Sequence, residues 1–205
     1  ILGIILAACG GSGSGSGSGD GPAQPGGGDT LTPGATLGAN RGQALLGPIV
    51  GATVNVYEAE NFNGTPLCSL STSSLDAAEG PGVIDLTTCS TAPGRLYFLV
   101  VRGGDDVDAD DDGFLDSAPT PKIGALRALV SGDDIARGDF RINILTEIAY
   151  QSVTDTLLTG GNAAAIKDQL DNVANQLLDA DINSDEVINN TDLISFSPLL
   201  DANAV

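Results

Sequence analysis

The chain has 205 residues and a formal net charge of −19 at pH 7, with 27 acidic residues against 8 basic ones. Nucleic-acid binding depends on Lys and Arg side chains that neutralise phosphates, so this composition argues against a nucleic-acid partner. The sequence contains no His, which excludes Ser-His-Asp and Cys-His catalytic sites. We therefore expect no enzyme, although a hydrolase that uses a pair of carboxylates stays open as an alternative.

Residues 1–9 are apolar or glycine and end in the tetrapeptide Leu6-Ala7-Ala8-Cys9. This run is too short for a membrane-spanning helix, which needs ~20 residues, and it lacks the charged start of a secretory signal. The tetrapeptide resembles the lipobox of bacterial lipoproteins. That resemblance implies a truncated signal, cleavage before Cys9 and a diacylglycerol on its thiol. It also implies a membrane partner through this lipid and a location in the cell envelope, facing an extracytoplasmic space. In that family, a residue such as Gly10 after the cysteine implies the outer membrane or the cell surface.

Residues 10–42 are rich in Gly, Ser and Pro and carry few apolar side chains, which predicts a flexible linker. The remaining chain is long enough for one domain and a small second unit. We expect a β-rich domain over residues 43–145 and a helical segment over residues 146–205.

Three cysteines are present. If Cys9 carries lipid, Cys68 and Cys89 remain as an even pair in an oxidising compartment, where disulfides form. Such a bridge would stabilise the fold by about 3 kcal/mol in the chain-entropy model. Two buried free thiols are the alternative.

Short apolar stretches separated by turn residues predict about six strands. Residues 51–57 alternate apolar and polar side chains, which indicates a half-buried strand, whereas residues 96–101 are continuously apolar and indicate a central strand buried on both faces. The other expected strands are 66–70, 83–86, 125–130 and 140–145. Strands spaced in this way, without long helices between them, favour a mainly β fold, an antiparallel β-sandwich.

The segment Pro48-Ile49-Val50-Gly51-Ala52-Thr53-Val54-Asn55-Val56-Tyr57 resembles the opening strands of carboxypeptidase-regulatory-like and related Ig-like modules. This resemblance implies a transthyretin-like or Ig-like sandwich, a common module of bacterial surface proteins. The chain departs from that pattern between Leu67 and Cys89, where a cysteine-bearing insertion replaces a short hairpin.

Two helices are expected after residue 145. Thr146 is a candidate cap for the first, which runs to about Leu158 with Ile148, Val153 and Leu157 on one face. Asn162 is a candidate cap for the second, which continues to about residue 179. Its apolar stripe at helical spacing consists of Ile166, Leu170, Val173, Leu177 and Leu178.

The segment 105–116 contains seven aspartates, and from Asp108 onward it follows the pattern D-x-D-x-D-G-x-x-D. Calcium prefers six to eight oxygen ligands, which alternate residues of a tight loop can supply when a Gly makes the sharp turn. The predicted ligands are Asp108, Asp110, Asp112, the carbonyl of Phe114, and Asp116. Position 12 is Pro119, so the loop resembles a thrombospondin type 3 repeat more than an EF-hand. A solvated acidic loop without a cation is the alternative.

The segment 181–192 follows the pattern D-x-N-x-D-x-x-I-N-x-x-D and resembles an EF-hand loop, specifically that of dockerin modules. The predicted calcium ligands are Asp181, Asn183, Asp185, the carbonyl of Val187, Asn189 and Asp192. Glu186 stands where the pattern has Gly, which places a Cβ at the sharp bend. Dockerins carry two such loops, whereas one lies within this sequence. The alternative to calcium binding is that these side chains cap the flanking helices.

These features predict an exported, lipid-anchored structural or adhesive module that calcium stabilises. A module that binds a surface protein, as dockerins do, or a glycan is the second hypothesis. The carboxylate-based extracellular hydrolase is the third.

Overall fold

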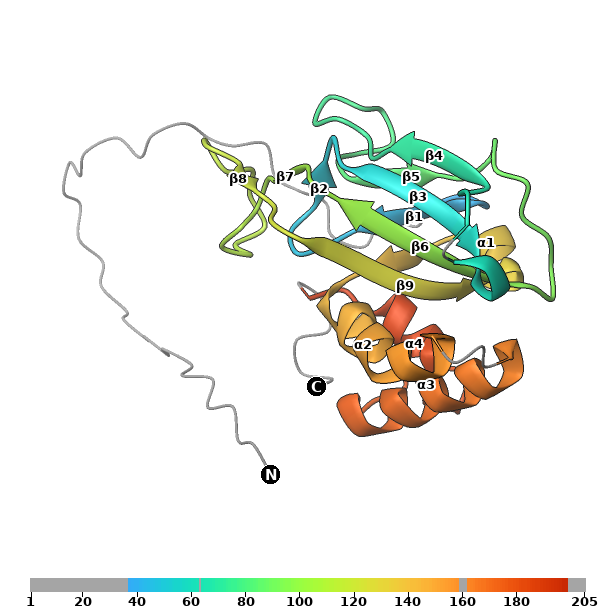
Figure 1. The fold of residues 1–205 in the computed structure, drawn as a ribbon. Helices are drawn as coiled ribbons and strands as arrows, with labels where there is room; N and C mark the ends of the chain where they lie inside the picture. The colour runs from blue at the N-terminus through green and yellow to red at the C-terminus, as the bar shows by residue number, and fades with distance from the viewer. Residues whose placement is uncertain (1–36, 63, 159–161, 199–205) are drawn as a thin grey trace, which may run out of the picture.

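The computed structural model describes residues 37–62, 64–158 and 162–198 and is mainly β (Figure 1). The strands are β1 (Arg41–Ala44), β2 (Ile49–Val50), β3 (Thr53–Glu58), β4 (Cys68–Ser71), β5 (Val83–Asp85), β6 (Leu96–Arg102), β7 (Asp105–Asp106), β8 (Thr120–Pro121), β9 (Ala125–Ser131) and β10 (Phe140–Ile142). The helices are the 3-10 turn η1 (Ala59–Asn61) and α1 (Gly132–Arg137), α2 (Ile144–Leu158), α3 (Ala163–Leu177) and α4 (Asn190–Ser195). None of the helices in this described part is long and apolar enough to cross a membrane.

The largest sheet has four antiparallel strands in the order β4-β3-β6-β9. Its central strand β6 is apolar on both faces, as the sequence predicts, because both faces of the sheet are covered. Tyr97, Leu99 and Val101 lie in one hydrophobic cluster, while Phe98 and Val100 lie in the other. Strand β3 alternates as expected, since Val54 and Val56 are buried whereas Asn55 and Tyr57 are half-buried.

A second sheet has the order β10-β1-β5 and lies behind the first in Figure 1. Side chains of both sheets meet in one cluster, in which Ala44, Ile84 and Ile142 of the second sheet contact the inward residues of β3, β6 and β9. β1 pairs antiparallel with β5 but parallel with β10. The sheets are therefore rich in antiparallel pairs without being wholly antiparallel as predicted. A parallel pair arises here because β10 returns to β1 through the remote connection that contains β6, β9 and α1.

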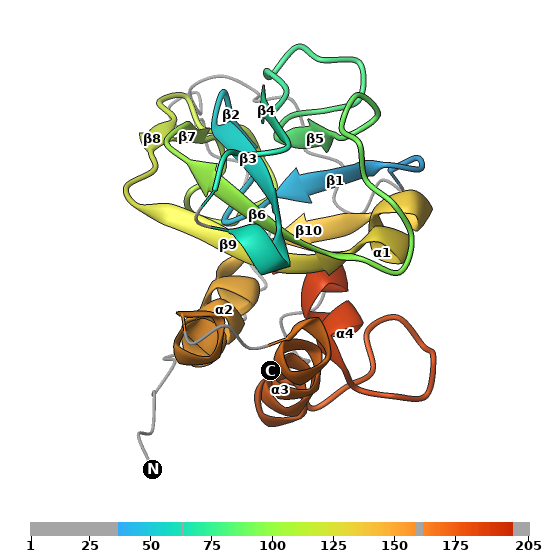
Figure 2. The same cartoon turned by 45° about the vertical axis from the view of Figure 1, so that its right-hand side comes forward.

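The helices α2, α3 and α4 cover the other face of the four-stranded sheet, on the side of β9 (Figure 2). Phe98 stacks on Tyr150 of α2, with 5.0 Å between the ring centroids. Leu129 of β9 lies in the same cluster, with Val153, Ile166 and other apolar residues of the helices. The predicted helical segment thus shares a core with the sheet.

The first of these helices begins earlier than predicted. Asn143, not Thr146, is the capping residue, because the backbone N–H of Thr146 donates to Asn143 Oδ1 at 3.0 Å. The backbone N–H of Asn143 donates in return to Thr146 Oγ1 at 3.0 Å, the reciprocal arrangement of a capping box. The predicted strand 140–145 consequently ends at Ile142.

The buried faces of the two long helices differ in how well the sequence predicts them. In α3 the cap at Asn162 is confirmed, and Ile166 and Leu170 are buried as expected. In α2, Ile148 is 43% exposed and does not share a face with the buried Val153. Tyr150 takes that place, because its ring fits against Phe98 of the sheet. The side chain of Leu157 lies outside the described residues.

The folded region begins before the predicted linker boundary at residue 42. Leu37 is buried, and β1 starts at Arg41. Arg41 forms an ion pair with Asp85 of β5 at 3.0 Å, opposite which it lies in the strand register. Hydrogen bonds from Thr87 and the neighbouring Arg41 guanidinium hold the pKa of Asp85 below its usual range. β1 was not predicted because its sequence is rich in polar residues. It is held in place by pairing with β5 and β10, which are remote in the sequence.

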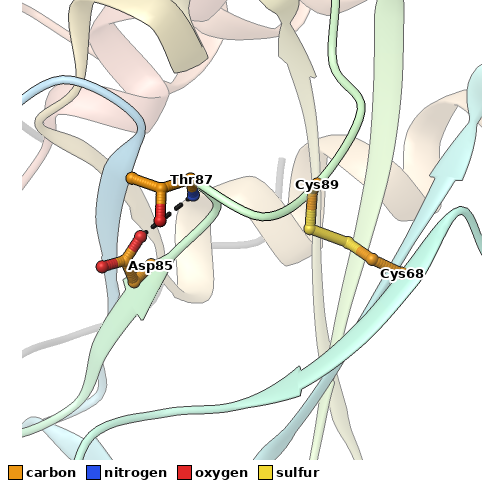
Figure 3. Close-up of a disulfide and its surroundings, with 4 residues drawn as sticks. All are labelled: Cys68, Asp85, Thr87 and Cys89. Carbon is orange, nitrogen blue, oxygen red and sulfur yellow. Dashed lines mark hydrogen bonds between the residues drawn. A yellow bond between two sulfur atoms is a disulfide. The ribbon is translucent and has the colours of Figure 1, made fainter.

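The predicted disulfide is present between Cys68 and Cys89 (Figure 3). It joins edge strand β4 of the first sheet to the loop that follows β5 of the second sheet. Both cysteines pack against the cluster between the sheets. The bridge therefore fastens the edges of the two sheets together, and it lies near the hydrogen-bonded pair of Asp85 and Thr87.

Gly42 leaves room for the Phe140 ring, so Gly42→Ala should destabilise the fold. An added Cβ would lie 2.2 Å from Phe140 Cε2, and Phe140 is 1% exposed and cannot move into solvent. Overpacking of this kind costs about 1–3 kcal/mol. Urea unfolding measures the change. Gly38→Ala is the matched control because a Cβ there meets no atom within 4 Å, and equal effects of the two variants would contradict the packing argument.

Candidate metal-binding loops

The first acidic loop, residues 105–116, begins in β7 and lies at one end of the sheets, beside β8 (Figure 1). β7 pairs with β2 on one side and with β8 on the other, forming a small third sheet. The loop is therefore held at its start by backbone pairing. Its acidic residues are carried on a short antiparallel ribbon and not on a helix.

Asp108, Asp110 and Asp112 come together in this loop. Each offers a carboxylate oxygen, and these oxygens all lie within 4.8 Å of one another, close enough to hold a metal ion between them. Asp108 is fully buried, whereas Asp110 and Asp112 are exposed. The loop thus presents one fixed carboxylate at its base and two at its rim.

Backbone donors fix the buried carboxylate. The N–H of Asp112 donates to Asp108 Oδ1 at 3.0 Å, and the N–H of Gly113 donates to Asp108 Oδ2 at 3.2 Å. The N–H of Phe114 donates to Asp112 Oδ1 at 2.9 Å. Gly113 has a φ of +83°, so the sharp turn predicted at this position is confirmed.

The electrostatics of the first loop favour neutralisation. Burial raises the pKa of Asp108, and the neighbouring charges of Asp112 and Asp110 raise it further, while the two backbone donors act in the opposite direction. Desolvation and the charges of Asp108 and Asp106 raise the pKa of Asp111 as well. The negative charge is therefore costly in the absence of a cation or proton.

Asp106 is a structural residue of this loop that the sequence did not single out. Its side chain is buried and accepts from the N–H of Gly47 and from the N–H of Asp108, both at 3.2 Å. Gly47 permits this approach, because a Cβ there would lie 2.5 Å from Asp106 Oδ1. In the sequence, Asp106 and the Gly-Pro pair that it contacts are 59 residues apart. An aspartate in a strand and a Gly-Pro turn are each too common to predict a contact across the fold.

Asp116, a further predicted ligand of the first loop, is not one of the three clustered carboxylates. Asp116 Oδ2 accepts from the N–H of Ala109 at 2.8 Å and thereby closes the loop. The ring of Phe114 is 49% exposed. Their roles as ligands stay predictions.

The second loop, residues 181–192, connects α3 to α4. Asp181 Oδ1 accepts from the N–H of Asp185 at 3.3 Å, and Oδ2 accepts from the N–H of Glu186 at 2.6 Å. Although desolvation acts to raise it, these donors and the N–H of Ser184 hold the pKa of Asp181 below its usual value. The N–H of Val187 donates to Asp185 Oδ1 at 3.0 Å.

The two loops share one backbone arrangement, although they are built on different elements. In each, the first aspartate accepts from the N–H groups of positions 5 and 6, and the aspartate at position 5 accepts from position 7. Position 4 is left-handed in both, with φ of +55° at Asp111 and +61° at Ser184. Position 6 is left-handed in both as well, at Gly113 and at Glu186, where φ is +72°. The bend predicted at Glu186 is therefore confirmed.

The later part of the second loop caps a helix. Asn189 and Asp192 form a capping box at the start of α4. Asp192 is fully buried, and its Oδ1 accepts from the N–H of Ile182 at 2.8 Å and from the N–H of Asn183 at 3.1 Å. The amide of Asn189 donates to the Val187 carbonyl at 3.1 Å. The capping alternative is thus realised for these two residues, and calcium ligation by the loop stays a prediction.

The second loop is also tied to the rest of the protein. Asn190 Nδ2 donates to the carbonyl of Leu129 in β9, and the N–H of Asn190 donates to Asp171 of α3, both at 3.0 Å. Asn175 Nδ2 donates to the carbonyl of Ile188 at 2.8 Å. Within residues 37–62, 64–158 and 162–198, the loop forms no set of three carboxylates comparable to that of the first loop, since its position 3 is the amide Asn183.

Comparison with known proteins identifies no relative: no family model, no curated protein and no solved structure matches the chain. The resemblances to lipoprotein, Ig-like and EF-hand families therefore remain predictions from short motifs. Cys9 and most of the predicted linker lie outside the described residues.

Substitutions at position 6 of the two loops should change stability in opposite directions. Gly113→Ala should destabilise the protein by about 1 kcal/mol and Glu186→Gly should stabilise it by a similar amount, because a left-handed residue with a Cβ costs roughly 1–2 kcal/mol. A Cβ at Gly113 meets no atom within 4 Å, so packing does not contribute there. Chemical unfolding without calcium measures both, and shifts of the same sign would contradict a shared backbone strain.

Proposed function

We propose that this protein is an exported, lipid-anchored component of the cell envelope, a non-catalytic structural or adhesive module whose loops calcium stabilises. The observation that carries the proposal is the cluster of Asp108, Asp110 and Asp112, whose oxygens lie within 4.8 Å of one another. Like charges at this separation destabilise a loop unless a cation lies between them.

Calcium suits these ligands best. All the candidate side-chain donors are carboxylate or amide oxygens, which hard cations prefer, and no His or neighbouring thiol is available for zinc. Magnesium demands a near-ideal octahedron and retains its waters, whereas calcium accepts irregular oxygen sets. An irregular, partly exposed loop therefore favours calcium, and extracellular sites of this kind function with weak affinities.

The shared backbone arrangement supports the assignment of calcium to the second loop. N–H groups that converge on the first aspartate of each loop orient its carboxylate before an ion arrives. The proposed ligands are Asp181, Asn183, Asp185, the carbonyl of Val187, Asn189 and Asp192. Asn183 contributes no charge and Asp192 is already engaged by three N–H groups, so we expect this loop to bind more weakly than the first.

A transthyretin-like or Ig-like sandwich is the finer fold that we propose for the two facing sheets, with an EF-hand-like segment formed by α3, the second loop and α4. Rigid loops at the end of such a module, held away from the membrane by a Gly- and Ser-rich tether, suit contact with a surface partner. The absence of His from the whole sequence supports a role without catalysis.

Calcium should raise the melting temperature of the protein. Binding to the folded state alone adds about 2.7 kcal/mol when free calcium is about a hundredfold above its Kd, which corresponds to roughly 5–10 °C in a domain of this size. Thermal denaturation with millimolar calcium and with chelator measures the shift. Asp110→Asn should abolish most of the calcium-dependent shift in melting temperature, and Asp185→Asn should abolish the smaller part that the second loop contributes.

Asp76→Asn is the control, because Asp76 is exposed in the connection between β4 and β5. It should retain the full calcium shift. A wild-type melt that calcium leaves unchanged would overturn both loop assignments. A shift that Asp110→Asn retains in full would remove the first loop from the proposal.

Cys9→Ser should release the full-length gene product from the membrane fraction in a bacterium that acylates lipoproteins. The lipid is the proposed anchor, and stable anchoring needs more than one acyl chain on the protein. Fractionation and incorporation of labelled palmitate provide the measurement. The Cys68→Ser, Cys89→Ser double variant is the control and should remain acylated, whereas a Cys9→Ser protein that still carries label would contradict the anchor.

A further inference from the structure

Aromatic and arginine side chains surround an open pocket on the helix-facing side of the four-stranded sheet. Its volume is about 320 Å³, near the lower end of the roughly 300–1,000 Å³ of small-molecule pockets. The lining residues come from β3, the end of η1, β6, β9 and α2: Tyr57, Phe62, Phe98, Val100, Arg102, Arg127 and Tyr150. A pocket of this size accommodates one ring more readily than an extended chain.

Four aromatic rings lie beneath and beside the pocket: those of Phe98 and Tyr150 are buried, and those of Tyr57 and Phe62 are half-buried. Phe98 is buried at the centre, and its ring centroid lies 6.2 Å from that of Tyr57, 6.0 Å from that of Phe62 and 5.0 Å from that of Tyr150. The strand register produces this gathering, because Tyr57 lies directly opposite Phe98. The chain has three tyrosines and five phenylalanines, and four of these eight residues line one pocket.

Positive charge is concentrated at the same place. Six of the 8 basic residues form ion pairs with acidic side chains. The other two, Arg102 and Lys122, have no carboxylate within 4.0 Å among the described residues. Lys122 Nζ donates to the carbonyl of Val101 at 3.4 Å and to that of Gly124 at 3.2 Å, so its ammonium lies at the end of β6 that carries Arg102. With Arg127 and its partner Glu147, these two cations leave a local excess of positive charge in a chain whose net charge is −19.

The two arginines of the pocket differ in freedom. Arg127 is held by an ion pair with Glu147 at 3.4 Å and lies over the Tyr150 ring, with its guanidinium carbon 4.7 Å from the ring centroid. Arg102 is exposed at the end of β6. Arg127 is therefore a fixed guanidinium whose charge Glu147 partly neutralises, while the planar guanidinium of Arg102 can turn toward a ligand.

We propose that this pocket binds an acidic sugar residue, a uronate, whose carboxylate lies on Arg102, beside Arg127, and whose ring lies against Tyr57 and Phe62, the two half-buried aromatic side chains. A guanidinium binds a carboxylate through two parallel hydrogen bonds. Aromatic side chains present an apolar face to a partner. An inorganic anion would need only the arginines and a neutral sugar only the rings, whereas a uronate uses both. The proposal is independent of calcium and of the lipid anchor.

Tyrosine fluorescence of the full chain tests this directly, because the chain has no Trp and two of its three tyrosines line the pocket. Titration with glucuronate at constant ionic strength should give a saturable change. Glucose and acetate should give none at the same concentrations. Tighter binding of a glucuronate-containing oligosaccharide than of the monomer identifies a polysaccharide as the source, and equal binding identifies the free acid.

Arg102→Gln should weaken glucuronate binding by about tenfold or more, the effect of losing one charge-assisted hydrogen bond. Tyr57→Leu should weaken it as well, since it replaces a ring by a flexible apolar side chain. Arg137→Gln is the control. It makes the same change of charge at an exposed arginine of α1, which follows the end of β9 that pairs with the start of β6 and so lies remote from Arg102.

Equal weakening by Arg102→Gln and Arg137→Gln would overturn the proposal, because the effect would then be one of general charge. Acetate that binds as well as glucuronate, or glucose that does so, would overturn it too. Arg102 is exposed, so an unchanged melting temperature of Arg102→Gln separates lost binding from lost folding. Binding that persists in chelator keeps this outcome distinct from that of the calcium experiment.

Discussion

The structure depends on the burial of both faces of the four-stranded sheet. β6 lies between β3 and β9, and its apolar side chains point alternately to the second sheet and to the helices. Without α2, α3 and α4, Phe98, Val100 and Leu129 would be exposed to water, at a cost proportional to their apolar area. The helices are therefore part of the core, and buried polar contacts such as that of Asn143 with the Leu193 and Phe196 carbonyls fix where they lie.

That core supplies rigid positions for the two acidic loops. The first is fastened through Asp106 to Gly47, and the second through Asn190 to β9 and α3. In each loop, backbone N–H groups donate to the first aspartate, so its carboxylate is held in place by the main chain of the loop itself. Loops of this kind pay little ordering cost when a cation binds. The same sheet positions the aromatic and arginine side chains of the pocket, since neighbouring strands present alternate residues on one face.

Much of the fold follows from periodicity. The alternation in β3, the continuous apolar run of β6, the cap at Asn162 and the stripe of α3 are local features that the surrounding structure leaves in force. The predicted start of α2 was wrong because Asn and Thr both favour the cap position, and β10 ends early enough for Asn143 to occupy it. In α2 the predicted face was wrong at Ile148, because Tyr150 packs against Phe98 of a remote strand instead, whereas Val153 is buried as predicted.

The sequence by itself determined the four strands of the larger sheet, the cysteine pair and the positions of both acidic loops, because period, turn residues and charge density are local properties. Tertiary structure alone decided that β10 pairs parallel with β1, that Asp108 is buried while Asp110 and Asp112 stay at the rim, and that Asp192 serves as a cap. It also decided that two arginines meet four aromatic rings in one pocket. These features join residues that are far apart in the chain, and only the packing of sheet on sheet and helix on sheet brings such residues together.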